Sequence, residues 1–229
     1  MASEVFAAGF LSAMSFDILA PHYRWMELIL AGGKLHRCRI AFLDEIPAAR
    51  NILLLGEGHG RGLVECCRRF RNARITCVDA SEAMLTQARR RWERCATGAT
   101  TVEFLHADLL QEIPSNQTYD LIITNFFLDC FQVEQLERMI PRIAQVASHD
   151  ACWLIADFQL ADQGLSRLRS RLMLWIMYGF FRRVTGLTAQ KLTEPDLYLQ
   201  RAGFTLRQRV TSEWGLLRSD WWQRSPNVG

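Results

Sequence analysis

The stretch that decides the fold of this chain is NILLLGEGHGRG, residues 51–62. Its apolar residues 52–55 predict a buried strand, and the turn that follows carries glycines at alternate positions, from Gly56 to Gly62. A second apolar run, residues 75–78, ends at Asp79. Glycines after a first strand let the backbone approach a ligand closely, and a carboxylate after the neighbouring strand can bind both hydroxyls of a ribose. The pattern therefore predicts a nucleotide-type pocket.

From this stretch onward, short apolar runs alternate with amphipathic segments. Strands are expected at residues 52–55, 74–79, 101–106, 119–124 and 151–158. Helices are expected between them, at residues 61–70, 81–95 and 133–146. Strands separated by helices of roughly 10–15 residues are typical of parallel βαβ units and predict an α/β, doubly wound sheet. Ligands bind such sheets beyond the carboxyl ends of the strands, where the sequence places Gly56, Asp79, His106, Asn125 and Asp157.

The segments on either side of this alternating region differ from it. Residues 1–46 are expected to form two helices, 17–30 and 35–46, which either cover one edge of the sheet or cap the pocket. After the fifth strand, residues 167–183 predict a helix that is apolar on nearly every face and bracketed by arginines. The chain is expected to end with a helix at 194–202 and two strands at 204–210 and 214–222.

No repeat and no low-complexity linker divides the chain, so we expect one domain that spans residues 1–229. Within it we distinguish four parts. They are a helical cap at 1–46, a core at 51–160, a helical insert at 161–192, and a C-terminal helix with two strands at 193–229.

The composition agrees with a single globular domain, since 49% of the 229 residues are hydrophobic and 22% are charged. A net charge of +3 is too small to indicate a nucleic-acid partner. Seven cysteines without a C-x-x-C pair indicate reduced thiols, and no basic segment marks a signal peptide, so a cytoplasmic protein is expected. The longest uncharged apolar run, residues 172–181, is about half of the ~20 residues that span a bilayer.

The glycine loop does not fit the two commonest nucleotide motifs. In the dinucleotide pattern G-x-G-x-x-G, the third glycine falls on Arg61 or on Leu63, depending on the register. A phosphate-binding Walker loop requires Lys followed by Ser or Thr, and neither pair is present here. What remains is G-x-G-x-G between a strand and a helix, with Asp79 nineteen residues beyond Gly60.

Together these residues resemble the class I S-adenosylmethionine-dependent methyltransferases, a Rossmann-like family of which the small-molecule type is the nearest. The residues that carry the resemblance are Ile52-Leu53-Leu54-Leu55-Gly56-Glu57-Gly58-His59-Gly60, Val78-Asp79-Ala80-Ser81, Ala107-Asp108-Leu109 and Tyr119-Asp120-Leu121-Ile122. The resemblance implies a mostly parallel seven-stranded sheet that an antiparallel C-terminal hairpin completes. One position departs from the family, because Leu54 stands where an acid is usual, and Glu57 is the expected substitute in organising the loop.

The resemblance also implies that S-adenosylmethionine is the cofactor. Asp79 is then expected to hold its ribose, Asp108 to accept a hydrogen bond from its adenine, and Tyr23 to lie over it. The full set of implied cofactor-binding residues is Tyr23, Gly56, Glu57, Gly58, His59, Gly60, Asp79, Ala80, Met84, Asp108, Leu109, Asn125 and Phe126.

Methyl transfer from a sulfonium is an in-line displacement that needs a base only where the acceptor loses a proton. The candidate catalytic residues are His22, Asp129 and Asp157, and no metal is expected because their spacing matches no ligand set. The candidate substrate-binding residues are Phe127, Trp175 and Tyr178. Such a lining favours a small apolar or aromatic acceptor. The segment after the fourth strand lacks the N-P-P-Y-type tetrapeptide of enzymes that methylate nucleic-acid bases, which lowers the expectation of a nucleic-acid substrate.

Several alternatives stay open on the sequence. The chain could be a non-catalytic partner module with a methyltransferase fold, or an NAD(P)-dependent oxidoreductase, although the third glycine of the latter is missing. The arginine-bracketed helix at 167–183 is compatible with core packing, with a dimer interface, or with peripheral contact to an anionic membrane. Both a monomer and a homodimer are consistent with these patterns.

Overall fold

The structure is a computed structural model that describes residues 33–95, 99–185 and 192–225, without the side chains of residues 177, 178 and 180–185. Its centre is a seven-stranded sheet with the strand order β3-β2-β1-β4-β5-β7-β6. The strands are β1 (Asn51–Leu55), β2 (Arg74–Asp79), β3 (Thr101–His106), β4 (Tyr119–Asn125), β5 (Ala147–Phe158), β6 (Phe204–Ser212) and β7 (Leu217–Arg224). The first five strands pair in parallel, whereas β7 is antiparallel to both β5 and β6. This confirms the predicted doubly wound sheet with a C-terminal hairpin.

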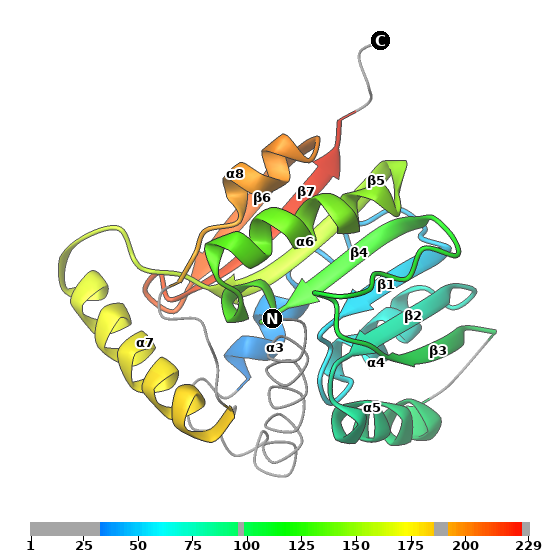
Figure 1. Ribbon diagram of the computed structural model, residues 1–229, viewed down its shortest axis with the longest axis horizontal. Coiled ribbons are helices and arrows are strands. Elements are labelled where there is room, and N and C mark those ends of the chain that lie inside the picture. Colours follow the sequence, from blue (N-terminus) through cyan, green and yellow to red (C-terminus); the bar gives the residue numbers. More distant parts are fainter. Residues whose placement is uncertain (1–32, 96–98, 186–191, 226–229) are drawn as a thin grey trace, which may run out of the picture.

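Helices cover both faces of the sheet (Figure 1). They are α3 (Lys34–Ile40), α4 (Arg61–Arg69), α5 (Glu82–Cys95), the 3-10 helix η1 (Leu128–Cys130), α6 (Val133–Gln145), α7 (Gly164–Thr185) and α8 (Asp196–Arg201). The core on one face is built with α6 and α8, and the core on the other face is built with α4 and α5. The predicted helix at 17–30 lies outside the described residues.

The central strand β1 explains why the sequence begins its pattern with an uninterrupted apolar run. Leu53 and Leu55 pack in the core under α6, whereas Ile52 and Leu54 pack in the core under α4. All four side chains are almost completely buried. A parallel strand covered by helices on both sides reads as continuously apolar instead of alternating. Leu54 therefore belongs to the hydrophobic core.

Several sequence-based boundaries were wrong, among them the starts of β5 and α7, which begin at Ala147 and Gly164 instead of residues 151 and 167. The helix expected at 35–46 ends at Ile40, and the turns that follow it bury Phe42, Leu43 and Ile46 against the sheet. The last strand was expected to begin at Trp214, but β7 begins at Leu217. Trp214 instead lies in the turn after β6 with a positive φ of 62°, and its side chain is 75% exposed. The apolar residues of this turn therefore gave the alternating pattern that is typical of a strand.

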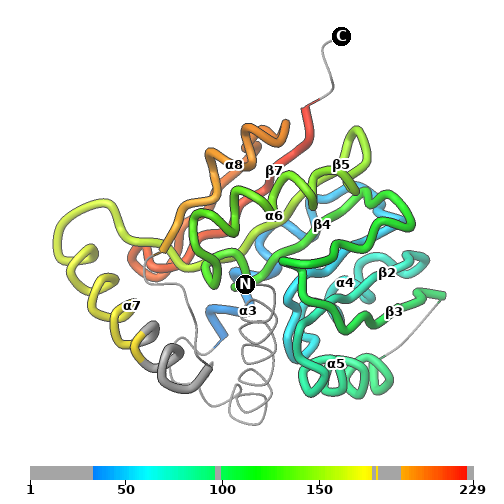
Figure 2. Tube along the Cα trace, in the orientation of Figure 1, coloured from blue at the N-terminus to red at the C-terminus, as the bar shows by residue number. Residues whose placement is uncertain are grey.

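The insert after β5 is a single helix, α7, which stands at the side of the molecule (Figure 2). One face of it packs on the sheet through Leu174, which contacts Leu216 next to the β6–β7 turn. Within the described residues, no helix combines the length and the apolar character that crossing a membrane requires. The division of the chain into cap, core, insert and C-terminal part remains a prediction.

The contact between α4 and α5 yields a stability prediction. Gly60 has φ 83°, and a Cβ placed on it would lie 2.7 Å from the Cα of Ala88 in α5. Gly203 has a similar φ of 87°, but a Cβ there would meet no atom within 4 Å. We expect Gly203→Ala to lower the free energy of unfolding by about 1–2 kcal/mol through backbone strain alone. Gly60→Ala should cost a further ~1–3 kcal/mol because the two helices must move apart.

Urea denaturation of the two variants side by side measures this difference. The backbone strain is common to both, so the excess destabilisation of Gly60→Ala reports the helix contact. Equal losses of stability would show that the α4–α5 crossing tolerates a methyl group.

Candidate functional site

The glycine loop after β1 is held by a carboxylate from the neighbouring strand. Asp79 accepts hydrogen bonds from the backbone N–H of Gly58, at 2.9 Å, and from that of Ser81, also at 2.9 Å. The two bonds use different oxygens of the carboxylate. The N–H of Gly56 in addition donates to the carbonyl of Val78, at 2.9 Å. The end of β2 therefore sets the conformation of the loop.

Inside the loop, Glu57 turns away from solvent and binds the start of α4. Its carboxylate accepts hydrogen bonds from the backbone N–H of Gly62, at 2.5 Å, and of Leu63, at 3.1 Å. These N–H groups have no partner within the helix, so an acidic side chain is well suited to them. Burial raises the pKa of Glu57, and the charge of Arg39 counters this effect. Glu57 thus supplies the organising contacts that Leu54, in the core, cannot make.

The far side of the pocket is formed by the turns after β2 and β3. Asp108 accepts hydrogen bonds from the N–H of Leu110 and the side-chain amide of Gln111, both at 3.0 Å. Met84 and Leu109 are buried on this side. A Cβ on Gly58 would meet only the sulfur of Met84, at 4.0 Å, so the surface above this glycine is open. The loop, Asp79 and Asp108 therefore border one continuous edge of the sheet.

Two of the predicted catalytic residues come together at the next strands of the same edge. Asp129 lies in η1 after β4 and Asp157 lies at the end of β5, and their carboxyl groups are within hydrogen-bond reach of each other. Among the described residues, none donates an N–H or O–H to either oxygen of Asp157. Two buried carboxyl groups this close together cannot both be ionised at low cost, so the pKa values of both are raised.

Burial is the main cause of the altered acidity of this carboxyl pair, as the two side chains are only 6% and 1% exposed. It raises the pKa of Asp129 to about 6. The pKa of Asp157 is raised well above its ordinary value, first by burial and then by the negative charge of Asp129. The carboxyl pair is therefore a group whose proton can be exchanged near neutral pH.

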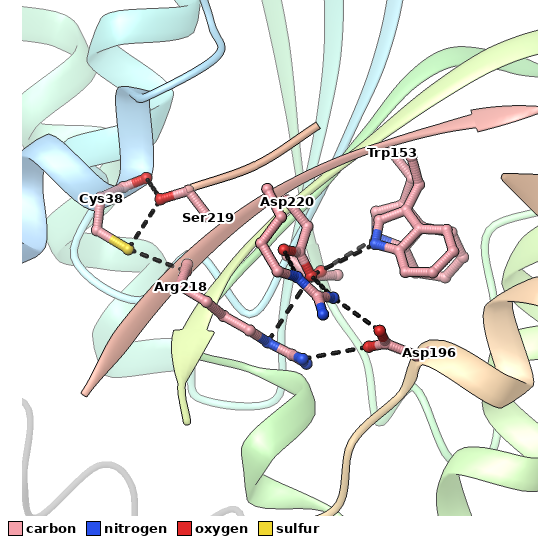
Figure 3. A network of polar contacts seen from close by, with 9 residues as sticks. Cys38, Trp153, Asp196, Arg218, Ser219 and Asp220 are labelled. Atoms are coloured by element: carbon pink, nitrogen blue, oxygen red, sulfur yellow. Dashed lines mark hydrogen bonds and ion pairs between the residues drawn. The ribbon is translucent and has the colours of Figure 1, made fainter. Parts of the chain in front are cut away.

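A buried arginine that the sequence did not predict as a site residue lies beside the carboxyl pair. Arg218 is paired with Asp157 across β5 and β7, and its positive charge lowers the pKa of both Asp129 and Asp157. Its guanidinium also reaches Asp196, at 3.2 Å, and Asp220, at 3.7 Å (Figure 3). In the sequence, Arg218 follows Leu217 in an ordinary strand pattern, so only the strand pairing reveals its neighbours.

The same network continues toward the surface and toward α3. Asp220 is bound at 2.6 Å by Arg209 of β6, which also contacts Asp196, at 2.8 Å. On the other side, the hydroxyl of Ser219 donates to the backbone carbonyl of Cys38 in α3, at 2.8 Å (Figure 3). These contacts fix β7, and with it Arg218, against the remainder of the domain.

Aromatic side chains lie beside the glycine loop and at the ends of β4 and β5. Phe127 lies where a side chain on Gly56 would be, and its ring stands edge-on to Phe131, with centroids 4.9 Å apart. Phe126 packs on Phe158, with centroids 5.2 Å apart, and has a strained φ of 54°. The neighbourhood of the carboxyl pair is therefore largely apolar.

The remaining predicted residues are distributed as follows. Asn125 is buried at the end of β4 beside Gly62, and His59 is buried in the loop. Trp175 is 69% exposed on α7. His22, Tyr23 and the side chain of Tyr178 lie outside the described residues. The assignment of all predicted residues to cofactor, acceptor or catalysis stays a prediction.

Known proteins resemble this chain in sequence and in fold. Residues 52–150 match the family model described as "Methyltransferase domain". Malonyl-[acyl-carrier protein] O-methyltransferase of Halalkalibacterium halodurans is 32% identical over 108 residues, a match that covers 46% of this chain and 36% of that protein. The matched part is thus about a third of the length of this curated relative.

Solved structures share the fold over most of the chain. The mitomycin 7-O-methyltransferase MmcR has a TM-score of 0.65 and 18% identity, and the match covers 90% of this chain and 60% of that one. The pyocyanin biosynthetic protein PhzM has a TM-score of 0.63 and 17% identity, and the match covers 86% of this chain and 57% of that one. Magnesium protoporphyrin IX methyltransferase from Synechocystis PCC 6803 was solved with bound S-adenosylhomocysteine. It has a TM-score of 0.61 and 21% identity, and the match covers 86% of this chain and 85% of that one.

The raised pKa values of the carboxyl pair predict how stability depends on pH. Because the folded-state pKa of Asp129 is raised from 3.8 to about 6, the folded protein binds more protons than the unfolded chain in this range. The free energy of unfolding should therefore fall by about 3 kcal/mol as the pH rises from about 4 to above 6. Asp157→Asn should reduce this dependence, because it removes the carboxyl group of Asp157, whose own pKa is raised well above its ordinary value.

Urea unfolding at a series of pH values checks the dependence. Asp150→Asn is the matched control, because the Asp150 side chain is 68% exposed and its removal should leave the slope unchanged. If the slope of Asp157→Asn equalled that of the unmodified protein, the carboxyl group of Asp157 would not have a raised pKa in the folded state.

Proposed function

Because residues 52–150 form a class I S-adenosylmethionine-dependent methyltransferase domain, we propose that the protein transfers a methyl group from S-adenosylmethionine to a hydroxyl oxygen of a small apolar or aromatic acceptor. The observation that carries the choice of a hydroxyl is the buried pair of Asp129 and Asp157. A hydroxyl acceptor must lose a proton, and this pair is a base with a pKa near the working pH.

The residues of the glycine edge fit the cofactor. The Asp79 carboxylate lies at the end of β2 and contacts the glycine loop, which is the position from which a carboxylate can bind the two hydroxyls of a ribose. The bare surface above Gly58 allows a ligand to approach the backbone. Asp108, at the end of the next strand, is partly exposed and can accept a hydrogen bond from the adenine. When bound, S-adenosylmethionine supplies an activated methyl group, so the protein mainly aligns the acceptor and excludes water.

Within the carboxyl pair, Asp129 is the proposed base. It is the more accessible member, and its pKa of about 6 leaves it ionised at neutral pH. Asp157 keeps its proton in this proposal because its pKa is raised well above the ordinary value, and Arg218 balances the negative charge of Asp129. As the hydroxyl attacks the methyl group, its proton passes to Asp129. The aromatic surroundings exclude water from this step.

The acceptor class is inferred from the side chains near the pair and from the relatives. Phe126, Phe127 and Phe131 are aromatic residues of the segment after β4 that also carries Asp129, and Phe127 lies against Gly56 of the loop. Two of the compared proteins are named as O-methyltransferases, and their names give malonyl-[acyl-carrier protein] and mitomycin. An N-methyltransferase, NodS of Bradyrhizobium japonicum, shares the fold as well, so the fold alone does not select the acceptor atom. The carboxyl pair is what favours oxygen.

The cofactor assignment predicts the effect of removing the Asp79 carboxylate. Asp79→Ala should weaken binding of S-adenosylmethionine by about 1.5–3 kcal/mol for each charged hydrogen bond that is lost. Isothermal titration calorimetry measures this change, with NAD as a second ligand and Asp44→Ala, a change at a 96% exposed carboxylate, as the control variant. Unchanged affinity in Asp79→Ala would mean that the ribose lies elsewhere, and tight binding of NAD alone would overturn the cofactor assignment.

The role of Asp129 predicts a loss of turnover with cofactor binding preserved. Incubation of the protein and methyl-labelled S-adenosylmethionine with a cell extract should yield a labelled product, from which the acceptor is identified. With that acceptor, kcat should rise with pH through about 6, since the base must be ionised. Asp129→Asn should lower kcat by roughly 10²–10⁴-fold.

Asp150→Asn serves again as the control and should retain full activity. A pH-independent kcat that Asp129→Asn does not reduce would remove Asp129 from the mechanism. Failure to label any product, with cofactor binding intact, would favour the non-catalytic partner module.

A further inference from the structure

Helix α7 carries a row of exposed apolar side chains that no feature of the proposed methyl transfer uses. Its members are between 55% and 86% exposed, and they are Leu165, Leu168, Leu172, Trp175 and Ile176. Their spacing of three and four residues places them on one face of the helix. The opposite face carries Ser170 and Leu174, which are buried against Ala161 and Leu216. The apolar row therefore points outward.

The charge of α7 is entirely positive. Its sequence, GLSRLRSRLMLWIMYGFFRRVT, contains five arginines and no acidic residue. Three of the arginines, Arg167, Arg169 and Arg171, are exposed in the same half of the helix as the first members of the apolar row. By their helical positions, Arg169 lies on one flank of the row and Arg171 on the other. An apolar stripe between basic side chains suits a surface that has an apolar interior and anionic groups at its boundary with water.

The β6–β7 turn adds a second exposed indole beside the helix. Arg169 donates a hydrogen bond to the backbone carbonyl of Glu213, at 3.4 Å, and the next residue is Trp214. Both Glu213 and Trp214 have positive φ values, of 55° and 62°. This conformation is unfavourable for a bulky aromatic residue, yet the turn keeps the Trp214 side chain 75% exposed. Trp175 and Trp214 are amphipathic side chains of the type enriched at membrane–water interfaces.

We propose that α7 and the β6–β7 turn form a docking surface for membranes that contain anionic lipids. The helix lies parallel to the bilayer, so the apolar row enters the boundary of the acyl chains and the arginines contact phosphate groups. A second copy of this chain is a poorer partner, because a two-fold interface through α7 would bring like-charged arginines together. This docking surface is independent of the proposed methyl transfer.

The test is co-sedimentation of the full chain with lipid vesicles. The unmodified protein should bind vesicles of equimolar phosphatidylcholine and phosphatidylglycerol, and it should bind vesicles of phosphatidylcholine alone at least ~10-fold more weakly. Raising the salt concentration should reduce the difference between the two compositions, because salt screens the contribution of the arginines.

Two variants separate the apolar and the basic contributions. The double change Leu172→Ser with Trp175→Ser should lower the partition coefficient on the mixed vesicles about tenfold or more. The triple change of Arg167, Arg169 and Arg171 to Gln should remove most of the preference for anionic lipid. Leu197→Ser and Arg201→Gln, at exposed positions of α8, are the matched controls and should bind like the unmodified protein. Thermal unfolding by circular dichroism should show that every variant is folded.

A spectroscopic measurement gives a readout that does not depend on affinity. Brominated lipid should quench part of the tryptophan fluorescence of the unmodified protein. Trp175→Phe should bind vesicles as before, but brominated lipid should quench a smaller part of its fluorescence. The docking surface is overturned if the α8 variants weaken binding as much as the α7 variants do. It is also overturned if the unmodified protein binds neither type of vesicle. A third contrary result is an unmodified protein that sediments as a dimer while the Leu172/Trp175 variant sediments as a monomer.

Discussion

The contact on which the site depends is the pair of hydrogen bonds that Asp79 accepts from Gly58 and Ser81. They attach the glycine loop to the end of the adjacent strand, so the backbone that faces a ligand cannot move independently of the sheet. Glu57 secures the other side of the loop by binding the first N–H groups of α4. The loop is thus fixed by two carboxylates, one on each side. Both are acidic side chains used where backbone donors have no partner of their own.

The carboxyl ends of β4 and β5 follow a different principle. There the protein buries Asp129 and Asp157 close to each other, and the negative charge of Asp129 raises the cost of ionising Asp157. Arg218 reduces that cost, and it is itself held by Asp196 and Asp220. Such an arrangement contributes little to stability compared with apolar residues of the same size. Its chemical value is a carboxyl group that exchanges a proton near neutral pH, within an apolar setting.

Much of the fold could be predicted because the local signals agreed with the tertiary structure. Apolar runs separated by amphipathic helices are sufficient to indicate a parallel sheet, and the loop after β1 is recognisable from its glycines. The errors arose where an apolar residue served a surface or a turn. Trp214 imitated the first residue of a strand, although it lies in a tight turn with its side chain in solvent. For residues 167–183 the sequence left core packing, a dimer interface and membrane contact open, and only the structure shows that α7 exposes a whole apolar face.

The sequence by itself determined the sheet, the position of the glycine loop and the identity of the acids at its edge. These follow from short-range patterns, in which each residue is read with its neighbours in the chain. Only the tertiary structure decided that Asp129 meets Asp157 and that Arg218 lies beside them. Parallel strands bring their carboxyl ends to one edge, and the antiparallel return of β7 places its residue 218 opposite residue 157. The altered pKa values then follow from burial, which is a property of the assembled molecule and of no single segment.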